Sequence, residues 1–186
     1  MDNLLKGVNL YLIGMMGSGK TTVGQLLATQ LSYQFVDTDV LIERVAGQSI
    51  PQIFANAGEA EFRKLESQVL AELSAYSRRA IATGGGIILK RENWSYLRHG
   101  IVVWLDVPVE QLQARLQTDT TRPLLLDSDP AAKLRTLLDE RQSLYAQADI
   151  RVSCHPGEEP DQVSNRVLEK LRQVIKPSLA KPNGNG

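Results

Sequence analysis

The sequence predicts an α/β fold in which a parallel sheet of five strands is flanked by helices. Short runs rich in β-branched residues alternate with longer runs of helical pattern along the 186 residues, which is typical of this class. A glycine-rich segment also follows the first predicted strand directly and opens a helix. A chain of this length buries roughly 70% of its unfolded surface on folding, which supports a single core. We therefore expect one domain, residues 1–175, followed by a disordered tail, residues 176–186.

The order of the elements follows from the hydrophobic pattern. The five predicted strands are residues 8–13, 34–36, 79–83, 101–105 and 150–152. The helix-length segments are residues 20–31, 39–45, 59–76, 92–97, 109–116, 131–148 and 161–175. In the last of these, hydrophobic residues recur at three- and four-residue spacing, which predicts one buried face. The polar, proline-containing segment 118–130 predicts a mobile loop.

Composition excludes several classes of function. The 21 basic residues balance the 21 acidic residues, so we expect neither nucleic acid nor a membrane as a partner. The single cysteine, Cys154, allows no internal disulfide, and with only two histidines the chain offers no zinc-type ligand spacing. The N-terminus does not read as a signal peptide, and no apolar run approaches the ~20 residues of a membrane span. We expect a cytoplasmic monomer in which Cys154 serves packing.

A phosphate-binding motif follows the first predicted strand. The segment GMMGSGKT fits G-x-x-x-x-G-K-[ST], in which glycines let backbone N–H groups converge at a helix N-terminus. In such a loop the lysine, Lys20, reaches the β- and γ-phosphates, and the hydroxyl of Thr21 coordinates Mg²⁺. The residues assigned to nucleotide binding are Gly14, Met16, Gly17, Ser18, Gly19, Lys20, Thr21 and Thr22.

The motif alone does not name a reaction, because several classes of enzyme use it. Guanine-specific GTPases carry an Asn-Lys-x-Asp element, and no asparagine here is followed by lysine. The chain is also short for a motor ATPase. A kinase of small molecules is therefore the most economical interpretation. A non-catalytic nucleotide-binding module and a nucleic-acid-stimulated ATPase remain as alternatives from other classes.

Charged residues near the carboxyl ends of the predicted strands suggest an acceptor site. Asp37 and Asp39 follow the second strand, where one carboxylate could hold Mg²⁺ through water and the other could orient a substrate hydroxyl. Helix capping by Asp37 and Thr38 is the alternative. Arg63 and Glu66 are spaced so that Glu66 could orient the Arg63 guanidinium toward a carboxylate, although an exposed ion pair would have the same spacing.

Three further features belong to the same hypothesis. The consecutive glycines Gly84, Gly85 and Gly86 permit close approach of a ligand, or form only a flexible turn. Arg122 in the predicted loop could neutralise charge on a transferring phosphoryl group, and Arg115 precedes it at the end of a helix. Arg141 could take part in binding or in a salt bridge on its own helix.

Taken in order, these motifs resemble those of shikimate kinases over about residues 8–172. The matching segments are GMMGSGKTT, DTD, EFRKLE, ATGGG, TRPLL and ERQSLY. The resemblance implies a three-layer P-loop kinase fold, with a substrate-binding region at about residues 38–66 and a lid at about 115–128. It also implies transfer of the γ-phosphoryl group of ATP to the 3-hydroxyl of shikimate. A kinase of another polyol acid, such as gluconate, is the rival within this class.

The resemblance assigns roles residue by residue. Shikimate would be held by Asp39, which is also the candidate base, and by Arg63, Gly84, Gly85, Gly86 and Arg141. The transferring phosphate would be stabilised by Lys20 and Arg122, and Mg²⁺ would be bound by Thr21 directly and by Asp37 through water. Arg115 would flank the adenine. Members of the family often place another basic residue near the adenine, which residues 154–159 do not obviously supply.

Overall fold

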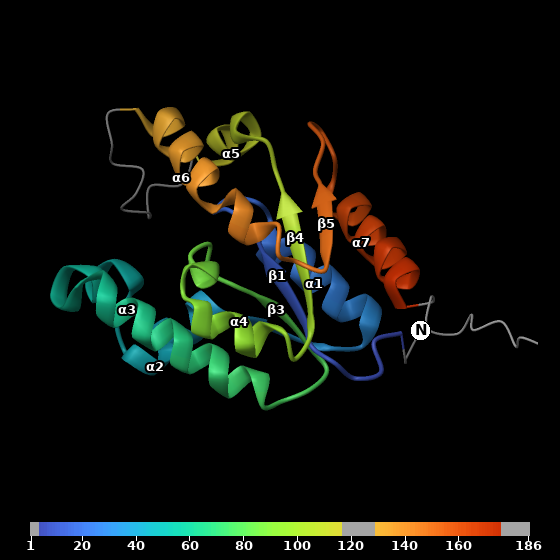
Figure 1. The fold of residues 1–186 in the computed structure, drawn as a ribbon, viewed down its shortest axis with the longest axis horizontal. Helices are drawn as coiled ribbons and strands as arrows, with labels where there is room; N and C mark the ends of the chain where they lie inside the picture. Colours follow the sequence, from blue (N-terminus) through green and yellow to red (C-terminus); the bar gives the residue numbers. More distant parts are fainter. Residues whose placement is uncertain (1–3, 117–128, 176–186) are drawn as a thin grey trace, which may run out of the picture.

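A parallel sheet of five strands lies between two layers of helices in the computed structural model, which describes residues 4–116 and 129–175 (Figure 1). The strands stand in the order β2-β3-β1-β4-β5, and every adjacent pair is parallel. Their bounds are β1 (Leu10–Ile13), β2 (Gln34–Asp37), β3 (Arg79–Ala82), β4 (Ile101–Asp106) and β5 (Ile150–Ser153). The fold class and all five predicted strands are confirmed, with ends that differ by at most two residues.

The central strand, β1, explains why the first predicted strand is hydrophobic throughout. Its four residues are fully buried, because strands pair with it on both edges and helices cover both faces. Leu10 pairs with Ala80 of β3 on one side and with Ile101 of β4 on the other. The exposed Val8, predicted as the start of this strand, lies before it. The glycine-rich loop therefore leaves the sheet from its middle.

The helices form two layers and a cap at the carboxyl edge of the sheet. In Figure 1, α1 and α7 lie side by side against one face, α3 and α4 cover the other, and α5 and α6 lie beyond the carboxyl ends of the strands. The bounds are α1 (Lys20–Leu31), α2 (Thr38–Ala46), α3 (Ile50–Ser74), α4 (Arg91–Leu97), α5 (Val109–Leu116), α6 (Pro130–Tyr145) and α7 (Pro160–Ile175), with a 3₁₀ turn, η1, at Ile87–Leu89.

Helix α3 begins nine residues before the predicted helix at 59–76. Ser49 and Gln52 form a reciprocal capping box at its start. The backbone N–H of Gln52 donates to Ser49 Oγ at 3.4 Å, and the backbone N–H of Ser49 donates to Gln52 Oε1 at 2.8 Å. Gly58 then interrupts the helix with φ 79° and ψ 175°. The prediction therefore captured only the part after this kink. The Ser-x-x-Gln spacing was the signal for the earlier part.

Two predicted features fall mainly outside the described residues. The tail at 176–186 and almost all of the loop at 118–130 are among them, and so is Arg122. At the end of that loop, Asp129 accepts a hydrogen bond from the backbone N–H of Ala132 at 3.0 Å and so caps α6. Pro130 is the first residue of α6, a position that needs no backbone donor. Across the two described ranges, no helix is both long and apolar enough to cross a membrane.

Buried Asn9 ties three segments together at the amino end of the sheet. Its side-chain amide donates to the carbonyl oxygens of Leu73 at 3.4 Å and Tyr76 at 2.8 Å, both at the end of α3. Its side-chain oxygen accepts from the backbone N–H of Arg79, the first residue of β3, at 3.0 Å. One side chain thus fixes the connection from α3 into β3 against β1.

We expect Asn9→Ala to lower the free energy of unfolding by about 2–3 kcal/mol, because it leaves buried backbone groups without partners. Urea unfolding followed by circular dichroism would measure the change. Asn56→Ala is the matched control, since Asn56 is exposed and its side chain makes a single exposed hydrogen bond. The control should cost less than about 0.5 kcal/mol. Equal effects of the two substitutions would contradict the role given to Asn9.

Candidate active site

The glycine-rich loop after β1 has a backbone that only glycine adopts without strain. Gly14 has φ 145°, Gly17 has φ 74° and Gly19 has φ 89°. A Cβ atom on Gly14 would also lie 2.6 Å from the carbonyl oxygen of Leu105 in β4. Gly19 is the N-cap of α1 and provides no side-chain cap at the positive end of the helix. The loop therefore has the geometry of an anion site.

Lys20 lies inside this loop. Its side chain is largely buried, and Nζ donates to the carbonyl oxygens of Gly14 at 2.9 Å and Met15 at 2.8 Å and to the hydroxyl of Ser18 at 3.3 Å. The ammonium is thus held over the concavity by oxygens of the loop itself. A polyphosphate bound there would meet this charge and the N-terminus of α1 together.

The two predicted metal ligands lie in direct contact. The Thr21 hydroxyl donates to Asp37 Oδ2 at 2.7 Å, while Asp37 Oδ1 accepts from the backbone N–H of Asp39 at 3.0 Å. Asp37 is the N-cap of α2, so capping and the proposed role coexist in one carboxylate. Thr38 does not cap the helix; its hydroxyl instead accepts from the N–H of Gly84 at 3.0 Å.

The triple-glycine turn after β3 lies between the phosphate loop and the acidic pair at the start of α2. A Cβ atom on Gly85 would lie 3.4 Å from the backbone nitrogen of Met16. On Gly84 it would lie 2.9 Å from Asp39 Oδ1 and 2.8 Å from Glu66 Oε1. The glycines are therefore required by packing, because side chains at these positions would meet neighbouring atoms. The turn is thus more than the flexible connection that was the alternative.

The third glycine of the turn makes room for a guanidinium group. A Cβ atom on Gly86 would lie 2.5 Å from Nη2 of Arg63 and would overlap Nη1. Arg63 donates to Glu66 Oε2 at 2.8 Å and forms a second ion pair with Glu59 at 3.2 Å. The side chain of Glu66 is 0% exposed and that of Arg63 is 15% exposed, so the alternative of an exposed surface pair is wrong.

Glu66 is a buried carboxyl group at the centre of this cluster. Burial raises its pKa above the usual range, the Arg63 guanidinium opposes that shift, and the neighbouring Asp39 carboxylate adds to it. The pairing orients one edge of the Arg63 guanidinium and leaves the group close to the glycine turn. The arrangement suits a guanidinium that must receive an anion.

Arg141 lies on α6, one helical turn before Tyr145. Its side chain is 8% exposed, and within the described residues its ε nitrogen has no hydrogen-bond partner and it forms no ion pair. The alternative of a salt-bridged helix residue therefore finds no partner in this part of the chain. Tyr145, one turn further along α6, donates from its hydroxyl to the carbonyl oxygen of Gly85 at 2.6 Å. Helix α6 thus reaches the glycine turn through the side chain of Tyr145.

A cavity of about 330 Å³ opens beside the phosphate loop. Arg115, at the end of α5, donates to the carbonyl oxygen of Gly17 at 3.2 Å and lines the cavity. The other lining residues are Gly17, Ser18, Gly19, Thr22, Val23, Cys154, Glu158, Pro160 and Val163. Its size and its position next to the loop suit a nucleoside.

Residues 154–159 contribute Cys154 and Glu158 to the wall of this cavity. Glu158 accepts hydrogen bonds from the backbone of His155 at 3.0 Å and from the guanidinium of Arg166 at 2.7 Å. The basic group paired with this segment comes from α7, eight residues after Glu158. Spacing alone did not single out Arg166 or Tyr145, although Tyr145 shares a helical face with Arg141.

Cys154 offers a direct test of the cavity. Burial raises the pKa of its thiol to about 11, so only about one molecule in a thousand carries a thiolate at pH 8. We expect iodoacetamide to modify the folded protein at least about a hundredfold more slowly than the urea-unfolded chain. ADP should slow the reaction further because Cys154 lines the cavity. Mass spectrometry would follow the single cysteine, and a rate insensitive to ADP would contradict nucleotide binding there.

Comparisons of sequence agree with this geometry. The family model for shikimate kinase matches residues 16–172. The curated shikimate kinase of Trichormus variabilis is 57% identical over 180 residues, covering 97% of this chain and 99% of that protein. The shikimate kinase of Rippkaea orientalis is 52% identical, covering 96% of this chain and 95% of that protein.

Solved structures agree as well. The shikimate kinase from Acinetobacter baumannii in complex with shikimate superposes with a TM-score of 0.86 at 39% identity, covering 95% of this chain and 98% of that chain. A gluconokinase from Sinorhizobium meliloti shares the fold alone, at 16% identity and a TM-score of 0.55 with 92% and 95% coverage. With a family model over most of its length and relatives above half identity, this chain belongs to the shikimate kinase family.

Proposed function

We propose that this chain transfers the γ-phosphoryl group of ATP to the 3-hydroxyl of shikimate, giving shikimate 3-phosphate and ADP. The observation that carries the proposal is the triple-glycine turn, which lies against the phosphate loop on one side and against Asp39 and Arg63 on the other. A donor and an acceptor bound to these groups would lie next to each other. Membership of the shikimate kinase family supports shikimate as the acceptor.

On the donor side, the loop N–H groups and Lys20 bind the β- and γ-phosphates and neutralise the charge that develops as the phosphoryl group moves. Thr21 and Asp37 supply the hydroxyl and carboxylate oxygens that suit Mg²⁺, which usually takes few protein ligands together with phosphates and water. When bound, this ion neutralises charge on the phosphate oxygens. Arg115 flanks the adenine in the adjoining cavity.

On the acceptor side, Asp39 orients the substrate hydroxyl and accepts its proton as the oxygen attacks the γ-phosphorus. The bond from phosphorus to the bridging oxygen of ADP breaks in the same transfer, so atoms and charge balance. Arg63, Arg141 and the N–H groups of the glycine turn, Gly84, Gly85 and Gly86, hold the carboxylate and the ring. Two guanidinium groups facing one carboxylate supply the charge-assisted bonds that fix its orientation.

The proposal also covers the domain regions, the partners and the cellular compartment. Residues 38–66 form the substrate-binding region of one domain, 1–175, and the segment 115–128 with Arg122 acts as the lid. The proposal includes a monomeric protein. Balanced charge supports a function without nucleic acid or membrane, and a single cysteine suits the reducing cytoplasm.

The decisive assay is ADP release by the purified protein with Mg-ATP and shikimate. We expect turnover that depends on shikimate and a kcat/KM for shikimate at least about a hundredfold above that for gluconate, because a site built for one acceptor leaves charged groups unpaired with another. Added DNA or RNA should not stimulate ATP hydrolysis. Absence of shikimate-dependent turnover would refute the proposal. Turnover of gluconate alone would favour the rival kinase.

We expect Arg63→Lys to raise KM for shikimate about 10- to 100-fold with little change in KM for ATP, because lysine keeps the charge but lacks the planar pair of donors. Initial-rate kinetics with each substrate varied in turn would measure this. Lys64→Ala is the matched control, since Lys64 is the next residue on α3 and its side chain is 63% exposed. Equal KM values for shikimate in the two variants would contradict the role of Arg63.

A further inference from the structure

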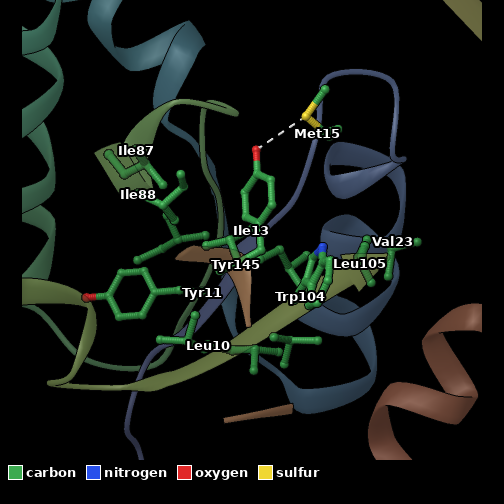
Figure 2. Packing of buried hydrophobic residues seen from close by; sticks show 14 of the residues in the cluster. Leu10, Tyr11, Ile13, Met15, Val23, Ile87, Ile88, Trp104, Leu105 and Tyr145 are labelled. Atoms are coloured by element: carbon green, nitrogen blue, oxygen red, sulfur yellow. Dashed lines mark hydrogen bonds between the residues drawn. The ribbon is translucent and has the colours of Figure 1, made fainter. Parts of the chain in front are cut away.

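Tyr145 is a fully buried side chain that the proposed reaction does not use. Its ring stacks on Trp104 of β4, with centroids 5.8 Å apart and an interplanar angle of 21°. Its hydroxyl points away from the sheet core toward the phosphate loop, where Met15 lies (Figure 2). The hydroxyl lies 2.6 Å from the carbonyl oxygen of Gly85 and 3.7 Å from the sulfur of Met15. One hydroxyl therefore touches both ligand loops.

The two contacts of this hydroxyl are unequal. A tyrosine carries a single hydroxyl proton, and at 2.6 Å the carbonyl oxygen of Gly85 receives it. The sulfur of Met15 is then a weaker packing contact. Removal of the hydroxyl would leave the Gly85 carbonyl without its side-chain donor in a largely buried place.

The bond to Gly85 also sets the direction of the next N–H group. No peptide bond in the described residues is cis, so the N–H of Gly86 points opposite to the carbonyl of Gly85. Within those residues no protein acceptor receives a hydrogen bond from the Gly86 N–H. By holding the carbonyl, Tyr145 turns this N–H donor away from α6 and leaves it for a ligand.

The charge of Arg141, one helical turn earlier, acts on the same hydroxyl. Burial raises the pKa of Tyr145 to about 12, while the charge of Arg141 acts to lower it. Arg141 is itself 8% exposed and its ε nitrogen finds no partner in the described residues. The hydroxyl thus holds a peptide and feels the charge of a guanidinium, and both groups are expected to meet the acceptor.

We infer that Tyr145 is a positioning residue for the acceptor carboxylate. Its hydroxyl holds the Gly85–Gly86 peptide in one orientation, beside the charge of Arg141, before the acceptor arrives. The acceptor then meets donors that need no reordering, which strengthens its binding. The inference rests on the proposed function, because it takes shikimate as the acceptor.

The substitution Tyr145→Phe isolates the hydroxyl, because phenylalanine keeps the ring that packs on Trp104. Loss of one buried hydrogen bond corresponds to about a three- to tenfold increase in the dissociation constant and KM for shikimate. The dissociation constant for ADP and kcat at saturating shikimate should stay within about twofold, because the phosphate loop keeps its own contacts. Isothermal titration calorimetry and initial rates would give these values.

Tyr11→Phe is the matched control. Tyr11 is also fully buried, but it lies in β1, and its hydroxyl points away from that of Tyr145 (Figure 2). An atom of its ring lies close to Gly100. Its loss of a hydroxyl should change neither dissociation constant. Unchanged shikimate binding in Tyr145→Phe would overturn the inference. An equal loss of ADP and shikimate binding would also overturn it, since the hydroxyl would then serve general stability.

A double-mutant cycle with Arg141→Lys adds a readout that a purely structural role would not produce. If Tyr145 acts through Arg141, Tyr145→Phe should weaken shikimate binding less in the Arg141→Lys background than in the wild type. Full additivity would assign the hydroxyl no effect through Arg141 and would count against the inference. The wild-type protein separates the two proposals. If it fails to turn over shikimate, the proposed function is refuted. If it turns over shikimate normally and Tyr145→Phe binds shikimate as tightly as the wild type, only the role of Tyr145 is refuted.

Discussion

Close approach of backbone to side chains at the triple-glycine turn is the constraint on which the site depends. The turn has the phosphate loop on one side, the carboxyl groups of Asp39 and Glu66 at its first glycine, and the Arg63 guanidinium at its third. Each of these groups occupies space that a Cβ atom would need. The turn also receives one hydrogen bond from α6 and gives one to the start of α2. Three elements distant in sequence are therefore brought to one place because this turn has no side chains.

Charge in the site is arranged so that buried groups have partners. Asp37 caps α2 with one oxygen and accepts from Thr21 with the other, which joins the acidic segment to the phosphate loop. Glu66 pairs with Arg63 inside the protein, where an isolated carboxylate would be costly. The same pairing holds the guanidinium in place beside the glycine turn. Local stability and the proposed chemistry thus use the same contacts.

Much of the fold could be predicted from the sequence, because its signals are local. Short runs rich in β-branched residues, set between longer helical patterns, located all five strands, and the glycine-lysine motif located the start of α1. The part of α3 before Gly58 was missed because a positive φ interrupts the helical pattern. Glu66 was recognised as a partner of Arg63 from spacing alone. Its complete burial was not, because burial depends on what α3 packs against.

The sequence by itself determined the chemical groups and their attachment to strand ends: a phosphate loop, a pair of carboxylates, two arginines and a glycine turn. These are properties of short segments, where residue type and spacing decide backbone shape. Tertiary structure decided which groups meet. Because of the packing, the Thr38 hydroxyl accepts a hydrogen bond from Gly84 instead of capping α2. Arg166 donates to Glu158, and the Tyr145 hydroxyl donates to Gly85. Contacts of this kind join residues on separate elements, so only the packing of the strands and helices specifies them.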